Sequence, residues 1–301
     1  MTWVNQVVQG IFLGGYYALL ATGLSLMFGV MRIINLAHAA LALVAAYMAV
    51  LLVDHTSLNP WLTLLPILPG ALVVGYLLQR TVLERSLRAG ELVPLLTTFG
   101  LLIIIGPVLQ RAYSPNSQSL DPGSLNGKGW SVTSSIRISA FAALTLGVAI
   151  AVLGLLHLFL TRTRMGREVR ACAQDPDTAG LVGVNARAVY ARATAIAVAT
   201  AALAGVFYGL RTSFTPYDGG TQLIYAFEAV VIGGLGSLWG TLWGGIALGV
   251  AQSVGFQVNT QYGPLFGHAL FLIVLVGRAL LEQRGVPALR LRRARAEATT
   301  G

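Results

Sequence analysis

The sequence predicts an all-α protein that is embedded in a membrane, and its composition carries that prediction. Of the 301 residues, 55% are hydrophobic and only 10% are charged, whereas about a quarter of the residues in an average soluble domain are charged. The mean hydropathy of +0.73 leaves too little polar surface to cover a globule in water. The composition therefore argues against a soluble enzyme, a nucleic-acid-binding module or a disordered chain.

The membrane-spanning helices are predicted from apolar runs, because a helix needs about 20 apolar residues to cross the hydrocarbon core. One of these runs, 222–236, is short and rich in glycine, so it is either a crossing or a re-entrant half-helix. We therefore expect about eight or nine transmembrane helices and half-helices, some of them broken. The predicted segments are 5–29, 36–53, 61–79, 92–110, 137–160, 190–211, 222–236, 239–256 and 264–281.

The positive charges predict which ends of these helices face the cytoplasm. The chain has 20 Lys and Arg against 11 Asp and Glu, a net charge of +9, and the arginines gather in short loops and in the tail. Arginine-rich loops face the cytoplasm, which places the C-terminus inside and, with nine crossings, the N-terminus outside. A further crossing near the start would reverse the N-terminal side. The charge is thus explained without a nucleic-acid partner. The arginine clusters are Arg80, Arg85 and Arg88; Arg162, Arg164, Arg167, Arg170 and Arg187; and Arg284, Arg290, Arg292, Arg293 and Arg295.

The chain is expected to form one transmembrane domain over residues 1–283, followed by a basic cytoplasmic tail over 284–301. Within the domain, the segment 161–189 is predicted to be a cytoplasmic loop and the polar segment 111–136 an external loop. The tail has too few apolar residues to fold, and we expect it to lie near anionic lipid headgroups.

Two stretches suggest an internal repeat. Tyr17 to Val53 and Tyr225 to Val254 each contain an apolar run, a break and a second apolar run. Interrupted helices in corresponding positions of two halves point to the substrate path of a transporter.

The first break holds Arg32, Asn35 and His38 between two strongly apolar runs. Non-helical backbone at membrane depth is tolerated only where protein or water surrounds it. The segment is therefore either a broken helix that lines a path or a plain turn with Arg32 at the headgroups, and residue types alone support both. His38 is better explained as a hydrogen-bonded packing residue than as a metal ligand. No Cys, His, Asp or Glu cluster with ligand spacing accompanies it, so no metal site is predicted.

A short helix is predicted within the 161–189 loop. Asp175 fits the N-cap position, Pro176 the first helical position and Gly183 the stop. The helix would present a small apolar face of Ala179, Leu181 and Val182. It is too short to be stable alone. It is either a docking element for a partner or an ordinary capped loop helix.

The second break, around Gly233, Gly234, Gly236 and Ser237, precedes further glycines at regular spacing. Small residues four positions apart let helix backbones approach closely, so helix packing is the first explanation. The alternative is a glycine-lined break whose free amides meet an anionic group. The packing glycines are Gly240, Gly244, Gly245 and Gly249.

Glu228 lies between apolar residues, where a carboxylate is costly unless it faces a partner or water. It is expected to pair with Arg32 or Arg211, or to lie near the external surface. If it lines a path, its replacement by Ala should impair transport.

Residues with the spacing that catalysis needs do not occur in the sequence. The four histidines are scattered over different segments, and Lys128 lacks the glycine spacing of a phosphate-binding loop. The chain is thus predicted to be neither an enzyme nor a nucleotide-binding protein. Its one cysteine, Cys172, excludes an internal disulfide and is expected to be a reduced thiol.

These stretches together resemble the permease subunits of bacterial ABC importers for branched-chain amino acids. The resemblance rests on Tyr17 to Gly29 with Ile34 to His38, on the loop that holds Arg170, Ala171, Ala173, Ala179, Gly183 and Asn185, and on Gly233 to Ser237 with Gly240, Gly244 and Gly245. The three blocks lie near the start, middle and end of the chain. Two positions depart from the family pattern: Ala39 stands where the family usually has Gly, and Glu228 where it more often has a small or apolar residue.

The resemblance implies a partner set and a location. Such permeases lie in the bacterial inner membrane, pair as homodimers or with a sister permease, bind two cytoplasmic ATPase subunits and receive substrate from an extracytoplasmic binding protein. ATP is then bound by the partners, and this chain holds no cofactor. Close relatives carry urea, short amides or polar amino acids. A passive channel without an ATPase is the alternative from another class.

The resemblance also implies roles for individual residues. The substrate path would lie beside the two breaks, and the middle loop would couple the membrane helices to the ATPases. The path residues would be Arg32, Asn35, His38, Glu228, Gly233, Gly234, Gly236 and Ser237, and the coupling residues Arg170, Ala173, Asp175, Pro176, Ala179, Gly183 and Asn185.

Overall fold

The computed structural model describes residues 3–283 except 91, 114, 126, 134 and 135. Seven of its helices are long and apolar enough to cross a membrane, and one further pair of helices is bent by 117° at a short break. These elements confirm the all-α membrane fold with eight or nine helices and half-helices. The predicted basic tail over 284–301 lies outside the described residues.

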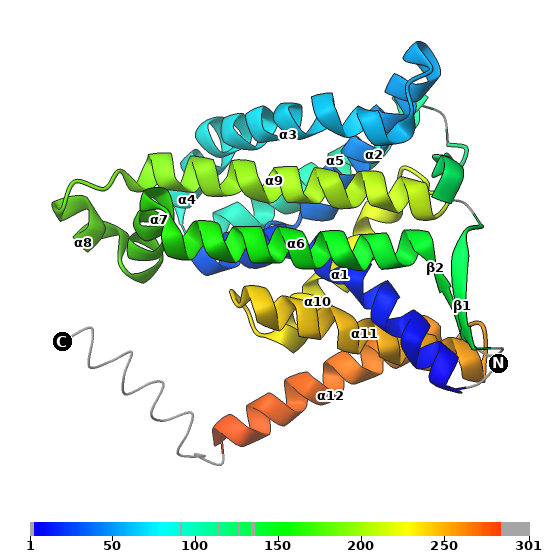
Figure 1. Ribbon diagram of the computed structural model, residues 1–301. Helices are drawn as coiled ribbons and strands as arrows, with labels where there is room; N and C mark the ends of the chain where they lie inside the picture. The colour runs from blue at the N-terminus through cyan, green and yellow to red at the C-terminus, as the bar shows by residue number, and fades with distance from the viewer. Residues whose placement is uncertain (1–2, 91, 114, 126, 134–135, 284–301) are drawn as a thin grey trace.

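The spanning helices run roughly along one axis (Figure 1). The long stretch Pro60–Ala89 is continuous, because a 3-10 turn, a π-helical turn and the short α4 extend α3 at both ends. The spanning helices are α1 (Trp3–Met31), α2 (His38–Thr56), α3 (Leu64–Leu78), α5 (Val93–Tyr113), α6 (Ala140–Arg162), α9 (Ala186–Arg211) and α12 (Gly263–Gln283); the bent pair is α10 (Asp218–Gly233) and α11 (Leu238–Val258); α4 is Glu84–Ala89.

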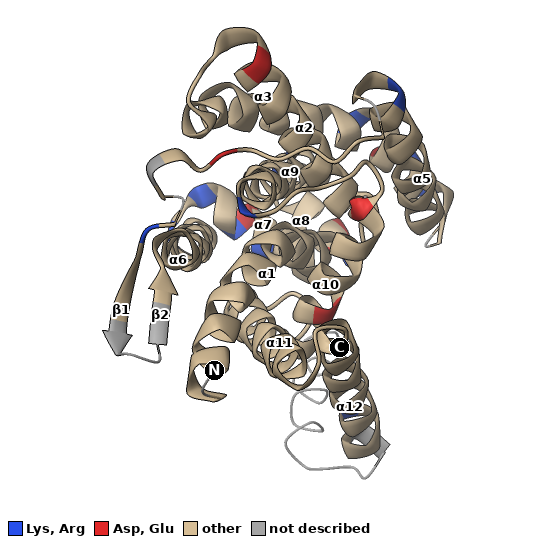
Figure 2. Ribbon diagram, turned by 90° about the vertical axis from the view of Figure 1, so that its right-hand side faces the viewer, with Lys and Arg blue, Asp and Glu red and all other residues tan. Residues whose placement is uncertain are grey.

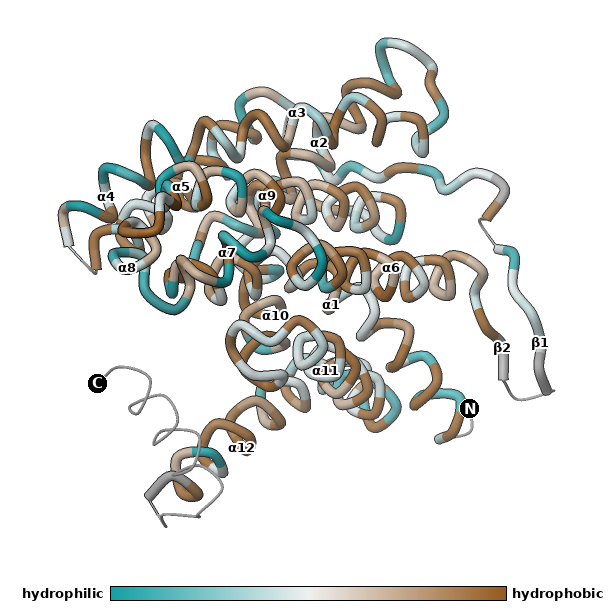
Figure 3. Tube along the Cα trace, turned by 60° about the vertical axis from the view of Figure 1, so that its left-hand side comes forward, coloured by the Kyte–Doolittle hydropathy of each residue, from teal (hydrophilic) through white to brown (hydrophobic). Residues whose placement is uncertain are grey.

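The two ends of the bundle carry different short elements. At one end lie α7 (Arg164–Gln174), α8 (Pro176–Leu181) and α4, and we call this the α7–α8 end (Figure 1). At the other, which we call the hairpin end, lies an antiparallel pair of strands, β1 (Gly129–Thr133) and β2 (Ile136–Ser139). The segment 111–136 was predicted only as a loop, but it contributes β1 and the start of β2. Hydrophilic stretches gather toward both ends, and the outer helices between them are largely hydrophobic (Figure 3).

The predicted arginine-rich loops lie at the same end of the bundle. Arg187, in the first turn of α9, pairs with Glu84 of α4 at 3.4 Å, and Glu84 also accepts from Arg88 at 2.6 Å. Two loops that are far apart in the sequence are thus joined at the α7–α8 end. This arrangement is the one that a common face toward the cytoplasm requires.

The core is built around α1 and α9, which are buried over most of their length. Both lie near the centre when the molecule is viewed from the hairpin end (Figure 2), with α3, α5, α6 and α12 around them. The outer helices expose long apolar side chains on their free faces, and only a small part of α12 is buried. An apolar exterior around a packed interior is what a helical bundle in lipid needs.

Close approach of backbones holds α11 between α1 and α10. A Cβ atom on Gly245 would lie 2.7 Å from the carbonyl oxygen of Gly14, and one on Gly10 would lie 2.5 Å from the Cα of Val250. Gly240 and Gly244 face the other way, against the backbone of Gly233 and Ala229. Helix α11 therefore carries two pairs of glycines spaced four residues apart: Gly240 and Gly244 face α10, and Gly245 and Gly249 face α1.

Replacement of Gly14 by Leu should disrupt this packing. The new Cβ would clash with backbone atoms of Ile246 that cannot rotate away, so we expect a loss of at least about 1–3 kcal/mol. The checks are the melting temperature and the monodisperse fraction in detergent. Gly147→Leu on α6 is the matched control, because a Cβ there meets nothing within 4 Å. Equal behaviour of the two variants would contradict the packing argument.

Candidate translocation and coupling sites

The first break is a returning segment that runs from the end of α1 to the start of α2. Arg32 directly follows the last residue of α1 and adopts the left-handed conformation, with φ of 55°. Its side chain is exposed. Asn35 and His38 are fully buried. The three polar residues therefore do not converge on one point: Arg32 lies apart from the other two.

The buried side chains of the break support its non-helical backbone. The Asn35 Oδ1 accepts from the amide of Ala37 at 3.0 Å, and the amide of Leu36 donates to the Thr98 Oγ1 of α5 at 3.1 Å. His38 Nε2 lies 2.9 Å from the carbonyl oxygen of Leu20 on α1. These bonds satisfy groups that lipid would leave without partners. The packing role expected for His38 agrees with this contact.

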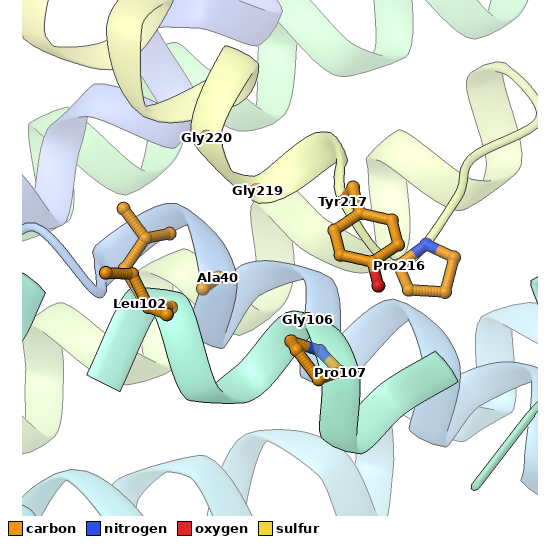
Figure 4. A pocket seen from close by; sticks show the side chains of 9 residues that line it. Ala40, Leu102, Gly106, Pro107, Pro216, Tyr217, Gly219 and Gly220 are labelled. Atoms are coloured by element: carbon orange, nitrogen blue, oxygen red, sulfur yellow. The ribbon is translucent and has the colours of Figure 1, made fainter. Parts of the chain in front are cut away.

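A cavity of about 340 Å³ opens beside this break, between α2, α5 and the start of α10 (Figure 4). Its wall combines small residues and prolines with the larger side chains of Leu102, Ile103 and Tyr217. Gly219 lies against Ala40, and Gly106 against the ring of Tyr217. The volume falls within the range of small-molecule sites. The lining residues include Ala40, Leu102, Gly106, Pro107, Tyr217 and Gly219.

The second break turns the chain back between α10 and α11. Gly234 and Gly236 have φ of 100° and 79°, a conformation that side chains with a Cβ rarely adopt. Ser237 caps α11 by accepting from the amide of Gly240 at 3.1 Å. Gly236 lies against Gly29 near the end of α1. The two breaks thus approach each other, while the predicted repeat between them stays a prediction.

Arg278 of α12 binds the end of α10, which the sequence did not suggest. Its Nη1 donates to the carbonyl oxygen of Val231 and its Nη2 to that of Ile232, both at 2.8 Å. The last carbonyls of a helix lack partners and carry a partial negative charge. The guanidinium therefore stabilises the helix end that precedes the break.

Glu228 faces α12 rather than either predicted arginine. Its carboxylate is 3% exposed, and its Oε1 lies 2.5 Å from His268 Nδ1. The His268 ring stacks on Tyr225 at 6.1 Å between centroids. The Oε2 atom has no hydrogen-bond partner among the residues that the structure describes. The sequence did not predict the pairing of Glu228 with His268, because His268 lies 40 residues further along the chain.

Removal of His268 should destabilise the protein more than removal of both partners. In His268→Leu the buried carboxylate of Glu228 loses the one partner it has among the described residues, which costs about 1–3 kcal/mol. The double variant with Glu228→Leu should recover part of that loss, because it no longer buries an unpaired charge. A double-mutant cycle on melting temperature measures both terms. Additive losses would show that the pair is not coupled.

The loop at the α7–α8 end is a rigid pair of helices. Thr163 caps α7, and Gly166 lies so close to the carbonyls of Phe159 and Leu160 that a side chain would not fit. Arg170 donates to the carbonyl of Leu160 at the end of α6. Cys172 is buried, and burial raises the pKa of its thiol. Glu168 lies 3.7 Å from Arg192 of α9, which ties α7 to the membrane helices.

The short helix α8 has the predicted cap. Asp175 accepts from the amides of Asp177 at 2.9 Å and Thr178 at 3.2 Å, and Pro176 occupies the first position. Gly183 follows with φ of 85°, and its amide donates to Gly180. Asn185 then caps α9 by accepting from Ala188. The helix is therefore held at both ends by local bonds.

The single apolar face predicted for α8 is wrong, because Ala179 is buried while the other two residues are exposed. Ala179 is 4% exposed and lies in a buried cluster with residues of α7 and α9, whereas Leu181 and Val182 are 87% and 78% exposed. Ala173 of α7 is half-buried. A single face of Ala179, Leu181 and Val182 does not exist, because the helix docks on the bundle through Ala179. The exposed tip of the loop is Leu181 and Val182.

The Asp175 cap should depend on pH. Hydrogen bonds from Thr178 and from the backbone of Asp177 hold the pKa of its carboxyl below the ordinary value. A carboxyl whose pKa is lowered by folding stabilises the fold at pH values above its pKa in the unfolded chain, near 3.9. This stabilisation is lost as the pH falls through its pKa in the folded chain. Amide exchange over 176–182 should therefore quicken at low pH in the natural protein relative to Asp175→Asn, whose cap does not titrate. Identical pH dependence in both would contradict the assignment.

The arrangement is that of a multi-pass α-helical membrane protein with one bent helix pair, whose break lies against the end of α1 at Gly29. Residues 6–276 match the family described as branched-chain amino acid transport system / permease component. The chain therefore belongs to this family. No solved structure matches it.

Three curated relatives show the range of the similarity. The high-affinity branched-chain amino acid transport system permease protein BraD of Pseudomonas aeruginosa is 31% identical over 92% of this chain and 94% of its own length. LivH of Escherichia coli K12, which has the same description, is 30% identical over 91% of this chain and 93% of its own. A probable branched-chain amino acid transport permease protein LivH of Methanocaldococcus jannaschii is 25% identical over 94% and 92%.

Proposed function

We propose that this chain moves branched-chain or related neutral amino acids across the bacterial inner membrane as the permease subunit of an ABC importer. The observation that carries the proposal is the tip of α8, where Leu181 and Val182 stand exposed on a capped and anchored helix. Exposed apolar residues on a rigid, otherwise polar loop are typical of a docking surface. The permease names of the relatives support the substrate class.

The proposed orientation follows the arginines. The α7–α8 end carries the paired loops with Arg80, Arg88, Arg187 and Arg192, so it would face the cytoplasm. The C-terminus would then lie on the cytoplasmic side. The hairpin end would face the extracytoplasmic binding protein.

The proposed partners divide the chemistry. Two cytoplasmic ATPase subunits would bind and hydrolyse ATP, and this chain would need neither a nucleotide nor a cofactor of its own. A second permease subunit, identical or a sister, would complete the membrane unit.

The coupling would pass from α8 into α9. Helix α8 shares a buried cluster with α9 through Ala179, and α7 is joined to α9 by the Glu168–Arg192 pair. Helix α9 packs along α1, α2 and α3. Closure of the ATPases would therefore tilt the core helices around the cavity beside the first break. This is alternating access around a weak binding site, with specificity set mainly by the binding protein.

Replacement of the α8 tip tests the proposal. In the double variant Leu181→Asp with Val182→Asp, we expect the ATPase subunit to be lost when the permease is affinity-purified from native membranes. ATP-driven leucine uptake should fall by about tenfold or more, because truncation of a hot-spot residue costs about 2 kcal/mol of binding free energy. Mass spectrometry identifies the proteins that are retained.

Thr161→Asp is the matched control, because Thr161 is an exposed residue of α6 at the same end. It should retain the ATPase and normal uptake. Recovery of a folded permease without any ATPase, from the natural chain, would instead favour an ATP-independent channel.

A further inference from the structure

A second cavity, of about 370 Å³, lies between α1, α6 and α11, where α9 ends. One part of its wall is aromatic and aliphatic, with Phe12, Leu13, Phe141 and Phe256. Another part is polar, with the side chains of Ser139 and Ser253. An apolar pocket with a few convergent polar groups is the usual form of a small-molecule site. We call it the Arg211 pocket, after its one charged residue.

Arg211 gives this pocket an unneutralised cation. Its guanidinium carbon lies 5.2 Å from the centre of the Tyr16 ring. It forms no ion pair with a carboxylate in the described part of the chain, and no Asp or Glu lines the pocket. A planar guanidinium held on a ring presents its fork to a carboxylate in bidentate geometry. The pocket therefore favours an anionic group beside an apolar one.

An outer pocket of about 490 Å³ adjoins it at the hairpin end. The two share Gln9 and Ser139 in their walls. The outer pocket adds the cation of Lys128 and the amide of Asn5. Asn5 is 6% exposed, and its Oδ1 has no hydrogen-bond partner among the described residues. A buried acceptor of this kind calls for an N–H donor.

We propose that the Arg211 pocket binds a free amino acid with an apolar side chain, which reaches it through the outer pocket. The α-carboxylate would bind Arg211, the side chain would lie among the phenylalanine rings, and the ammonium group would meet side-chain oxygens on the way in. Carboxylate, ammonium and apolar group are the three parts of one ligand class. This inference rests on the proposed function and names a contact point for its substrate.

The Arg211 pocket is connected to the cavity beside the first break by a layer of tyrosines. The Tyr16 hydroxyl donates to Gln222 of α10 at 2.9 Å, and its ring stacks on Tyr208 at 5.8 Å. Tyr208 in turn donates to Asp218 at 3.1 Å, next to Gly219 of that cavity. A ligand against Tyr16 therefore touches a network that positions the start of α10.

Protection of an introduced cysteine tests the site directly. Ala142 lines the Arg211 pocket and is half-buried, so Ala142→Cys in a Cys172→Ala background provides one label position. The full chain, purified with its partners, is placed in phosphatidylcholine nanodiscs and labelled with a water-soluble maleimide. Leucine at its dissociation constant should slow labelling by about half. Leucinamide, which lacks the carboxylate, should not. Ser57→Cys, exposed at the end of α2, is the control position and should not respond.

In Arg211→Gln, the leucine concentration that halves the labelling rate should rise by roughly tenfold to a hundredfold, because a charged hydrogen-bond pair is lost. Equal protection by leucinamide, or none by leucine, overturns the proposal. Protection that follows added phosphatidylglycerol and ignores leucine also overturns it, and assigns the cation to a lipid headgroup.

ATP-driven leucine uptake by the same complex separates the two proposals. An unchanged maximal rate of uptake in Arg211→Gln, at equal amounts of complex, would refute the Arg211 site and leave the permease function standing. Absence of ATP-driven uptake in the natural complex would refute the function, whatever the labelling shows.

Discussion

The close backbone contact between α1 and its neighbours is the constraint on which the rest of the structure depends. Gly10 and Gly14 let α11 approach α1, and Gly23 lies against α9. In lipid, such contacts replace the hydrophobic driving force that packs soluble helices, because lipid tails are as apolar as leucine. With α1 in the centre, the break between α10 and α11 lies against its end at Gly29, and the Arg211 pocket opens beside it.

Each departure from regular helix inside the bundle is matched by a polar group from another element. Thr98 of α5 accepts from the first break, and Arg278 of α12 donates to the carbonyls before the second. His268 of the same helix meets Glu228. α12 is the least buried spanning helix, yet two of its polar side chains bind α10. These contacts explain how a peripheral helix stays attached to the bent pair without a large apolar interface.

The ends of the bundle are built for different tasks. At the α7–α8 end, ion pairs of Glu84 and Glu168 join α4 and α7 to α9. Such exposed pairs contribute little stability each. At the hairpin end, Arg211 and Lys128 line pockets that no carboxylate neutralises among the described residues. One end thus exposes an apolar tip, and the other holds a cation in a pocket without a carboxylate among the described residues.

The sequence by itself determined what depends on neighbouring residues. Apolar length predicted the spanning helices, and Asp175 with Pro176 predicted a capped helix that the structure places at 176–181. The tertiary structure alone decided which side chains meet. Glu228 pairs with His268 instead of Arg32 or Arg211, Ala179 turns inward, and Arg211 lies on Tyr16. Capping and membrane insertion are local, so a single stretch of chain encodes them. Pairing of side chains from distant helices depends on how those helices pack, and no local pattern records that.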